Sequence, residues 1–126
     1  MKADLLRDCF ALFSNTDGSF KTLSAGTYRL HADDQEGFLL SDYEKMSATI
    51  ELKDIAGADL GVRLRVLHRQ MFVSVPPYKW VRSGQQATMR QSGEYVFEGN
   101  IKAPMLSFEL EVLSPTVQIR AFLNVR

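Results

Sequence analysis

The stretch that decides the fold is Pro104-Met-Leu-Ser-Phe-Glu-Leu-Glu-Val-Leu-Ser-Pro-Thr-Val-Gln-Ile-Arg-Ala-Phe-Leu-Asn-Val-Arg126. Its first half alternates apolar and polar residues, so one face of an extended strand would carry Leu106, Phe108, Leu110 and Val112. After the turn signal Ser114-Pro115 the alternation resumes, with Val117, Ile119, Ala121, Leu123 and Val125 on one side. The stretch therefore predicts two strands, each with one buried apolar face, and the rest of the chain must supply the strands that pair with them.

Shorter runs with the same alternation of apolar and polar residues precede this stretch and are separated by Gly, Pro, Asn, Asp and Ser. They cover residues 27–32, 38–40, 46–52, 62–66, 70–75, 78–81, 87–90 and 94–98. Parallel strands covered by helices on both faces would read as continuous apolar runs, which the alternation excludes. We predict an all-β protein, specifically an antiparallel β-sandwich of jelly-roll type.

The N-terminal segment is the one helix candidate. Between residues 4 and 13 apolar side chains recur at spacings of three and four, which predicts a short amphipathic helix. An opening strand over residues 9–13 is the alternative, because that run is rich in aromatic residues. The single cysteine, Cys9, is predicted to be a buried, inert thiol.

The composition is that of an ordinary globular chain. Its 126 residues suit a single domain spanning 1–126, with 45% apolar and 24% charged residues. Basic and acidic residues number 15 each, which removes long-range attraction to nucleic acid or an anionic membrane. Acidic residues interrupt the start of the chain, and no apolar run reaches membrane-spanning length. We expect a soluble protein without a signal peptide, cytoplasmic or virion-associated.

Catalytic motifs are not evident in the sequence. His31 and His68 fall on predicted strands without a serine elbow, a metal-binding histidine pair or a Cys-x-x-Cys partner. Glu109 and Glu111 share a strand face roughly 6–7 Å apart, a spacing that suits a glycosidase pair. Any solvent-facing strand shows the same spacing, so a solvated face is the favoured interpretation. The sequence predicts that the protein is not an enzyme.

Two clusters of charged residues could each bind a ligand or could simply be exposed to solvent. Asp33, Asp34 and Glu36 could supply oxygen ligands for calcium, but they do not match the EF-hand spacing, and a solvated loop is favoured. Arg63 and Arg65 could form a basic strip for single-stranded nucleic acid. The neutral total charge disfavours nucleic acid as a partner.

Aromatic residues around Pro76-Pro77 form the most suggestive group. Sugar rings present a face of C–H bonds that stacks on aromatic rings, while planar polar side chains bind their hydroxyl groups. The candidate ligand-binding residues are Trp80, Tyr78 and Phe72 for stacking and Arg82, Gln85, Gln86 and Asn100 for hydrogen bonding, with Tyr43 and Phe122 as further aromatic candidates. A buried core position is the alternative interpretation of Trp80.

Several segments together resemble the strands of carbohydrate-binding-module-type jelly rolls. The closing strands of that family are similar to Gly61-Val-Arg-Leu-Arg-Val, Tyr78-Lys-Trp-Val-Arg-Ser-Gly, Gly93-Glu-Tyr-Val-Phe-Glu, Pro104-Met-Leu-Ser-Phe-Glu-Leu-Glu-Val and Thr116-Val-Gln-Ile-Arg-Ala-Phe-Leu-Asn-Val. Ser24-Ala-Gly-Thr-Tyr-Arg-Leu is similar to the strand that opens their first sheet. The resemblance implies glycan binding without catalysis, usually with structural calcium.

We therefore expect a non-catalytic binding module that takes carbohydrate on a sheet-face aromatic platform. The alternative is a structural or assembly module of a virion, fibre or other homo-oligomeric complex, with Phe122, Leu67 and Val96 covered by partner chains. Single-stranded nucleic-acid binding through Arg63 and Arg65 is a third and weaker hypothesis. The expected partners are a glycan or a protein, including further copies of the chain, and no membrane is expected.

Overall fold

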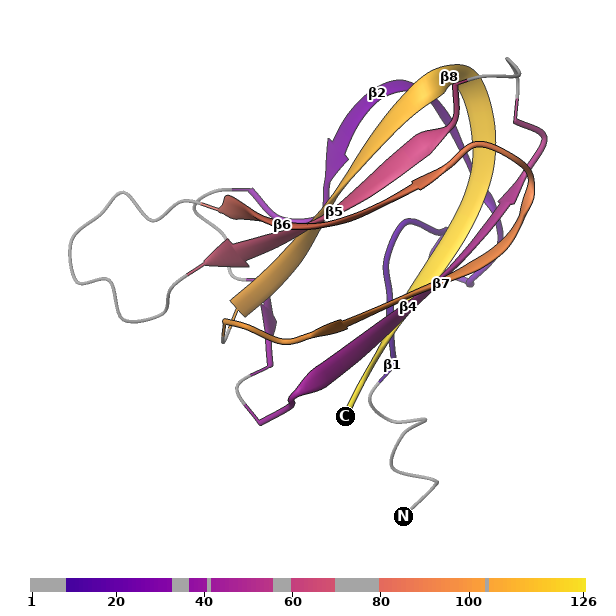
Figure 1. Cartoon of the computed structure of the whole chain (residues 1–126). Coiled ribbons are helices and arrows are strands. Elements are labelled where there is room, and N and C mark those ends of the chain that lie inside the picture. The colour runs from indigo at the N-terminus through magenta and orange to yellow at the C-terminus, as the bar shows by residue number, and fades with distance from the viewer. Residues whose placement is uncertain (1–8, 33–36, 41, 56–59, 70–79, 104) are drawn as a thin grey trace.

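A computed structural model describes residues 9–32, 37–40, 42–55, 60–69, 80–103 and 105–126. These residues form strands and loops, and no helix occurs among them. The strands are β1 (Cys9–Ala11), β2 (Lys21–Arg29), β3 (Phe38–Leu39), β4 (Lys45–Lys53), β5 (Val62–Arg69), β6 (Val81–Met89), β7 (Gly93–Asn100) and β8 (Met105–Val125). The predicted all-β class is confirmed (Figure 1).

Strand β8 is the central strand of the sheet. Its first half pairs with β5 and its second half with β4, while β2 pairs with both halves along the opposite edge. Strands β6 and β7 extend the sheet outward in the order β6-β5-β8-β4-β7, and every pairing is antiparallel. The described strands form one continuous sheet that curls so that β5 and β6 face β4 and β7 (Figure 1). The two predicted layers are therefore parts of one sheet, and jelly-roll topology stays a prediction.

The sheet curls at the predicted turn Ser114-Pro115, which is a bend inside one strand. Between its pairs with Thr116 and Val112 of β8, β2 advances two residues while β8 advances four, so β8 bulges there. Gly61 clamps the bulge: its N–H donates to the Ser114 Oγ at 2.8 Å, and its carbonyl accepts from the N–H of Leu113 at 2.8 Å. The two predicted strands are thus one strand that passes from one layer to the other.

The alternation in β8 correctly predicts the core. Its inward residues are buried, namely Leu106, Phe108, Leu110, Val112, Val117, Ile119, Ala121, Leu123 and Val125. They join the inward residues of β4 and β5, such as Ile50 and Leu64, in one hydrophobic cluster between the layers. Burial of this apolar surface stabilises the curl, because both halves of β8 contribute to the same core.

The predicted N-terminal helix is wrong for the part of it that the structure describes. Residues 9–11 form β1, which pairs with Asn124, Leu123 and Phe122 of β8, and residues 1–8 lie outside the described part. The edge of β8 offers backbone partners that a helix would leave unpaired, which favours the alternative of an opening strand. The prediction for Cys9 is also wrong, because this residue is exposed.

Strand β6 contains a second irregularity that the sequence signalled as a turn. This one strand contains Val81 of one predicted strand, the predicted turn at Arg82-Ser83-Gly84-Gln85, and residues 87–89 of the next predicted strand. Between Arg65 and Leu67 the partner strand advances by four residues, from Gln86 to Arg82, so the turn signal marks a bulge. Gly84 has a φ of 89° there, a conformation that favours glycine. The predicted strand over 70–75 lies outside the described residues.

Candidate functional site

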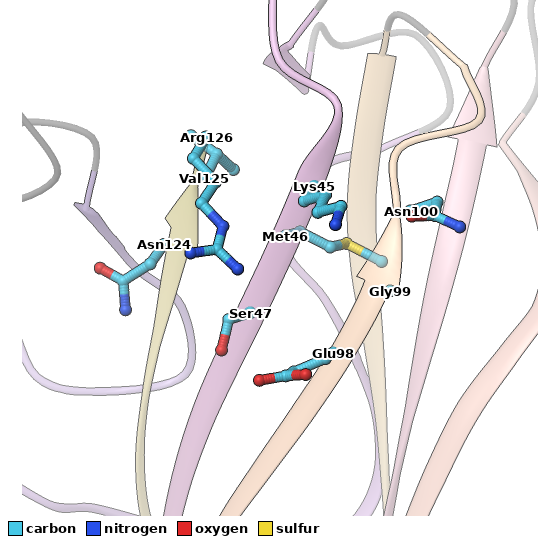
Figure 2. A pocket seen from close by; sticks show the side chains of 9 residues that line it. All are labelled: Lys45, Met46, Ser47, Glu98, Gly99, Asn100, Asn124, Val125 and Arg126. Atoms are coloured by element: carbon cyan, nitrogen blue, oxygen red, sulfur yellow. The ribbon is translucent and has the colours of Figure 1, made fainter.

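A pocket of about 470 Å³ lies where β4 begins and where β7 and β8 end (Figure 2). Its lining is formed by Lys45, Met46, Ser47, Glu98, Gly99, Asn100, Asn124, Val125 and Arg126. Six of these residues carry polar or charged side chains, and the pocket is partly open to solvent. Its volume lies within the range of small-molecule sites.

The strand register builds this pocket from three neighbouring strands. Ser47 of β4 lies directly opposite Glu98 of β7 on one side and Asn124 of β8 on the other. Because side chains alternate along a strand, these three residues share the outer face of the layer. Figure 2 shows Glu98 and Arg126 lying on either side of Ser47.

The next row along the strands completes the polar lining. Lys45 lies opposite Asn100, and the backbone of Arg126 exchanges hydrogen bonds with Lys45 at 2.9 and 3.0 Å. Lys45, Glu98 and Arg126 form no salt bridge with any residue in the described part of the chain. The pocket therefore offers an ammonium, a guanidinium and a carboxylate, together with a hydroxyl and two amides, to a ligand.

Strand β6 contacts the rim of the pocket from the other layer. The Nε2 of Gln85 donates to the carbonyl of Asn100 at 3.3 Å. Gly99 permits this approach, because a Cβ at that position would lie 2.8 Å from the Gln85 Nε2. Gln85, a predicted ligand-binding residue, is thus engaged in holding the layers together, while Asn100 lines the pocket itself.

The outer face of the opposite layer carries a buried carboxylate surrounded by arginines. Glu109 is 2% exposed, and its two oxygens accept hydrogen bonds from Arg29 at 3.1 Å, Arg65 at 3.2 Å and Arg82 at 2.8 Å. The register explains the cluster, since Glu109 lies directly between Arg29 of β2 and Arg65 of β5. Burial would raise the pKa of Glu109, but the hydrogen bonds and charge of Arg29, Arg82 and Arg65 hold it below its usual value.

The predicted solvated face for Glu109 and Glu111 is therefore wrong for Glu109. Both residues point to the same side, as expected, but the long arginine side chains cover Glu109 and leave Glu111 28% exposed. Glu111 accepts a hydrogen bond from Arg63 at 3.5 Å and forms a salt bridge with Arg65 at 3.1 Å. The charges of Arg63 and Arg65, the candidates for nucleic-acid binding, are thus paired within the fold.

Trp80 lies buried beside this charged face. It is 6% exposed, its Nε1–H donates to the carbonyl of Ala32 at 2.8 Å, and it clusters with Leu67 and Met105. A Cβ on Gly37 would lie 2.5 Å from the indole ring, so the backbone there covers it closely. Trp80 packs as a core residue in this structure, and a role in sugar stacking stays an untested prediction.

The remaining predicted site residues that the structure describes form no common site with Trp80. Arg82 is tied to Glu109, and Gln86 is exposed on the outer face of β6. Tyr78 and Phe72 lie outside the described residues, as do the calcium candidates Asp33, Asp34 and Glu36. Among the residues that are described, no group of three His, Cys, Asp or Glu side chains could hold a metal ion.

His31 and His68 are partly buried, and neither has a catalytic set of partners in the described part of the chain. The Nδ1 of His31 lies 2.8 Å from the Oγ of Ser107, a hydroxyl that is fully buried and out of reach of a substrate. The Nε2 of His68 is buried and has no hydrogen-bond partner among the described residues. Burial lowers the pKa of both histidines, and the charge of Lys102 lowers that of His68 further.

Sequence reasoning missed most of the pocket because its lining depends on register. Lys45, Ser47, Glu98 and Asn124 read as ordinary solvent-facing positions on strands far apart in the chain. Only the pairing of β4 with both β7 and β8 brings them together. The available signal was a polar residue on the outer face near the end of each strand, which many solvated strands share.

Comparisons with known proteins place the chain by fold. No family model matches it, and no curated protein sequence is significantly similar to it. The exported protein XepA of PBSX matches with a TM-score of 0.59 and 11% identity over 93% of this chain and 36% of its own. Tripeptidyl peptidase 2 matches with a TM-score of 0.52 and 14% identity over 94% of this chain and 10% of its own.

The solved structures similar to the chain also include carbohydrate-binding modules. A family 16 module matches with a TM-score of 0.46 and 9% identity over 90% of this chain and 81% of its own. The weak resemblance to carbohydrate-binding-module-type folds is thereby confirmed. At these identities the likeness concerns the fold alone, and the chain spans about a third of the length of XepA.

The described part of the chain contains no helix that could span a membrane.

Proposed function

We propose that the protein is a non-catalytic binding module that takes carbohydrate in the polar pocket on the outer face of β4, β7 and β8. The observation that carries this proposal is the row Asn124-Ser47-Glu98, in which three hydrogen-bonding side chains from adjacent strands face one solvent-open pocket. Such a row supplies donors and acceptors a few ångströms apart, as the hydroxyl groups of a sugar require.

The chemistry of the lining favours a sugar over an apolar ligand. Amide, hydroxyl and carboxylate groups can each donate to or accept from a hydroxyl, and they are held on a paired sheet that needs little reorganisation on binding. Phe122, an aromatic candidate of the sequence, lies on the same outer face, one row beyond Ser47 and Asn124 and opposite Thr49. It is half-buried, so part of its ring is available beside the polar row.

The lining also favours binding over hydrolysis. Glycoside hydrolysis generally uses a pair of acidic side chains that flank the scissile bond. Glu98 is the one acidic side chain among the residues that line this pocket. A single carboxylate can accept hydrogen bonds from a sugar but lacks the partner that the usual mechanism needs.

The test is a glycan array followed by calorimetric titration of the best-bound oligosaccharide. We expect Asn124→Ala and Glu98→Gln each to weaken binding about tenfold, because each removes a hydrogen-bonding group from the row. Thr22→Ala is the control, since Thr22 is an exposed hydrogen-bonding residue on β2 that does not line the pocket. Binding that resists both pocket variants, or no binding to any glycan, would refute the proposal.

A second candidate function is assembly with further copies of the chain. It is favoured by the outer strands β6 and β7, each of which pairs on one side only among the described residues. Open sheet edges expose backbone groups that another strand can satisfy.

A further inference from the structure

The edges formed by β6 and β7, each paired on one side only among the described residues, differ from protected edges in their regularity. Strand β7 pairs with β4 over eight consecutive residue pairs without a register shift, and it contains no proline and no lysine. In β6 the bulge is confined to the first half, and residues 86–89 pair regularly with β5. Proteins usually blunt an exposed edge with prolines, lysines or bulges, so these segments are suited to accept a further strand.

The two edges lie on the same side of the molecule and run in opposite directions. The topology explains the opposite directions. Strand β6 is parallel to the first half of β8, β7 is parallel to the second half, and β8 reverses its direction at the bend (Figure 1). The neighbouring ends of β6 and β7 also lie at the same height along the strand direction. Gln85 contacts Gly99 and Asn100 at one end, and only residues 91 and 92 separate Arg90 from β7 at the other.

The edges carry opposite charges on their outer faces. Strand β7 bears Glu94 and Glu98 and no basic residue, whereas β6 and the residue that follows it bear Arg82 and Arg90 and no acidic residue. Glu94 lies directly opposite Glu51 of β4, a like-charged neighbour. Neither Glu94 nor Arg90 has a salt-bridge partner in the described part of the chain.

We propose that two copies of the chain dimerise by pairing β6 of each copy antiparallel with β7 of the other. A two-fold axis parallel to the strands places the layer of β5 and β6 of one copy in line with the layer of β4 and β7 of the other copy. Each residue keeps its position along the strand direction. The axis therefore brings β6 of one copy beside β7 of its partner in the same layer. The pairing repeats on the other side of the axis, which closes the assembly at two copies.

The charges and the face alternation select one register. Placing Arg90 opposite Glu94 of the second copy puts Thr88 opposite Val96 and Gln86 opposite Glu98, with all six side chains on outer faces. Each Glu94 then gains a cation, and each Val96, which is 60% exposed in the single chain, gains a neighbour. Both layers continue across the interface, and the pocket at Glu98 borders the second copy.

This inference is independent of the proposed carbohydrate binding and is tested by the mass of the protein in solution. Sedimentation and light scattering should show a concentration-dependent dimer of the unmodified chain. Arg90→Glu or Glu94→Arg alone should weaken dimerisation at least about tenfold, because the two-fold axis repeats the like-charge contact twice. The double variant Arg90→Glu with Glu94→Arg should dimerise within about threefold of the unmodified chain, since it restores opposite charges.

Two further variants complete the test. Lys21→Glu is the charge-reversal control, because Lys21 is exposed on β2 and forms no salt bridge within the described part. In a Cys9→Ser background, Thr88→Cys combined with Val96→Cys should give a disulfide-linked dimer on mild oxidation, whereas Thr22→Cys with Val96→Cys should not. A strict monomer at high concentration, an open-ended oligomer, or a dimer indifferent to both edge reversals would overturn the proposal.

Discussion

The Glu109 carboxylate accepts hydrogen bonds from Nε and Nη2 of Arg82 at 3.1 and 2.8 Å, although the Arg82 side chain is 58% exposed and Glu109 only 2%. The guanidinium lies over the carboxylate and its polar groups reach solvent at the same time. A polar residue on the outward side of β8 is therefore buried without being isolated, because charged neighbours on three strands compensate its loss of water.

Glu109→Gln should destabilise the protein more than the equivalent change at its neighbour. Removing the charge takes away the anion that Arg29, Arg65 and Arg82 share, and we expect a loss of about 2–3 kcal/mol in the free energy of unfolding, at the low end for a buried pair because Arg82 and Arg29 reach solvent. Glu111→Gln, on the same face but more exposed, should cost about 1 kcal/mol or less. Urea denaturation at pH 7 measures both, and equal losses would contradict this account of the cluster.

Acid should remove the contribution of Glu109 in a defined window. Its pKa in the folded protein is lowered, so the stabilisation is fully present above the pKa of an unfolded glutamate, about 4.3. It is lost as the pH falls through the lower folded value. The difference in unfolding free energy between the unmodified chain and Glu109→Gln should stay constant from pH 7 to about 5 and shrink below pH 4. A difference that shrinks already between pH 7 and 5 would argue against this assignment.

His68 should produce a separate loss of stability at milder acidity. Burial, then the charge of Lys102, lowers its folded pKa below the ordinary 6.5. The unfolded chain therefore binds the proton first, and stability should fall as the pH drops below 6.5, by at most about 1.4 kcal/mol per pH unit. His68→Leu should flatten the profile between pH 7 and 5, with the remaining slope due mainly to His31. An unchanged slope would show that His68 is not responsible.

Gly61→Ala should be far more damaging than Gly84→Ala. Both glycines have positive φ, so both substitutions strain the backbone by about 1 kcal/mol. A Cβ at Gly61 would also lie 2.2 Å from the carbonyl oxygen of Met89, whereas at Gly84 no atom lies within 4 Å. We expect a loss of about 3 kcal/mol or more at Gly61 by thermal or urea unfolding. Similar losses for the two variants would mean that the clamp on the β8 bend is not tightly packed.

Trp80 should behave as a buried residue in solution. It is the one tryptophan of the chain, so intrinsic fluorescence reports on it alone. We expect blue-shifted emission, weak quenching by iodide, and no change in emission when an oligosaccharide binds in the pocket of β4, β7 and β8. Strong quenching that a bound sugar suppresses would instead support the original stacking prediction for Trp80.

The period-two pattern predicted the class of the fold because one face of each strand is buried in a common core. Leu106, Phe108 and Leu110 lie inward as the alternation indicates. The pattern could not reveal that Ser114-Pro115 bends one strand, because a bend and a reversal use the same turn-forming residues. It also could not show that Glu109 is buried, since the arginines that cover it come from strands distant in the sequence.

The candidate site was less predictable than the fold. An aromatic residue next to prolines and glutamines indicates sugar binding only if its ring is exposed, and Trp80 instead packs beneath Gly37. Asn100 was a candidate and does line the pocket, but its neighbours Ser47 and Asn124 became candidates only through the register. Local residue types thus suggested the chemistry, while long-range pairing decided where it lies.

The most direct test of the proposed function is to map a bound oligosaccharide by the backbone amide shifts of isotope-labelled protein. The account predicts that the largest changes cluster at Ser47, Glu98 and Asn124 on the outer face of β4, β7 and β8. Changes centred instead on Arg82, Gln86 and the surroundings of Trp80, or scattered without a cluster, would contradict it.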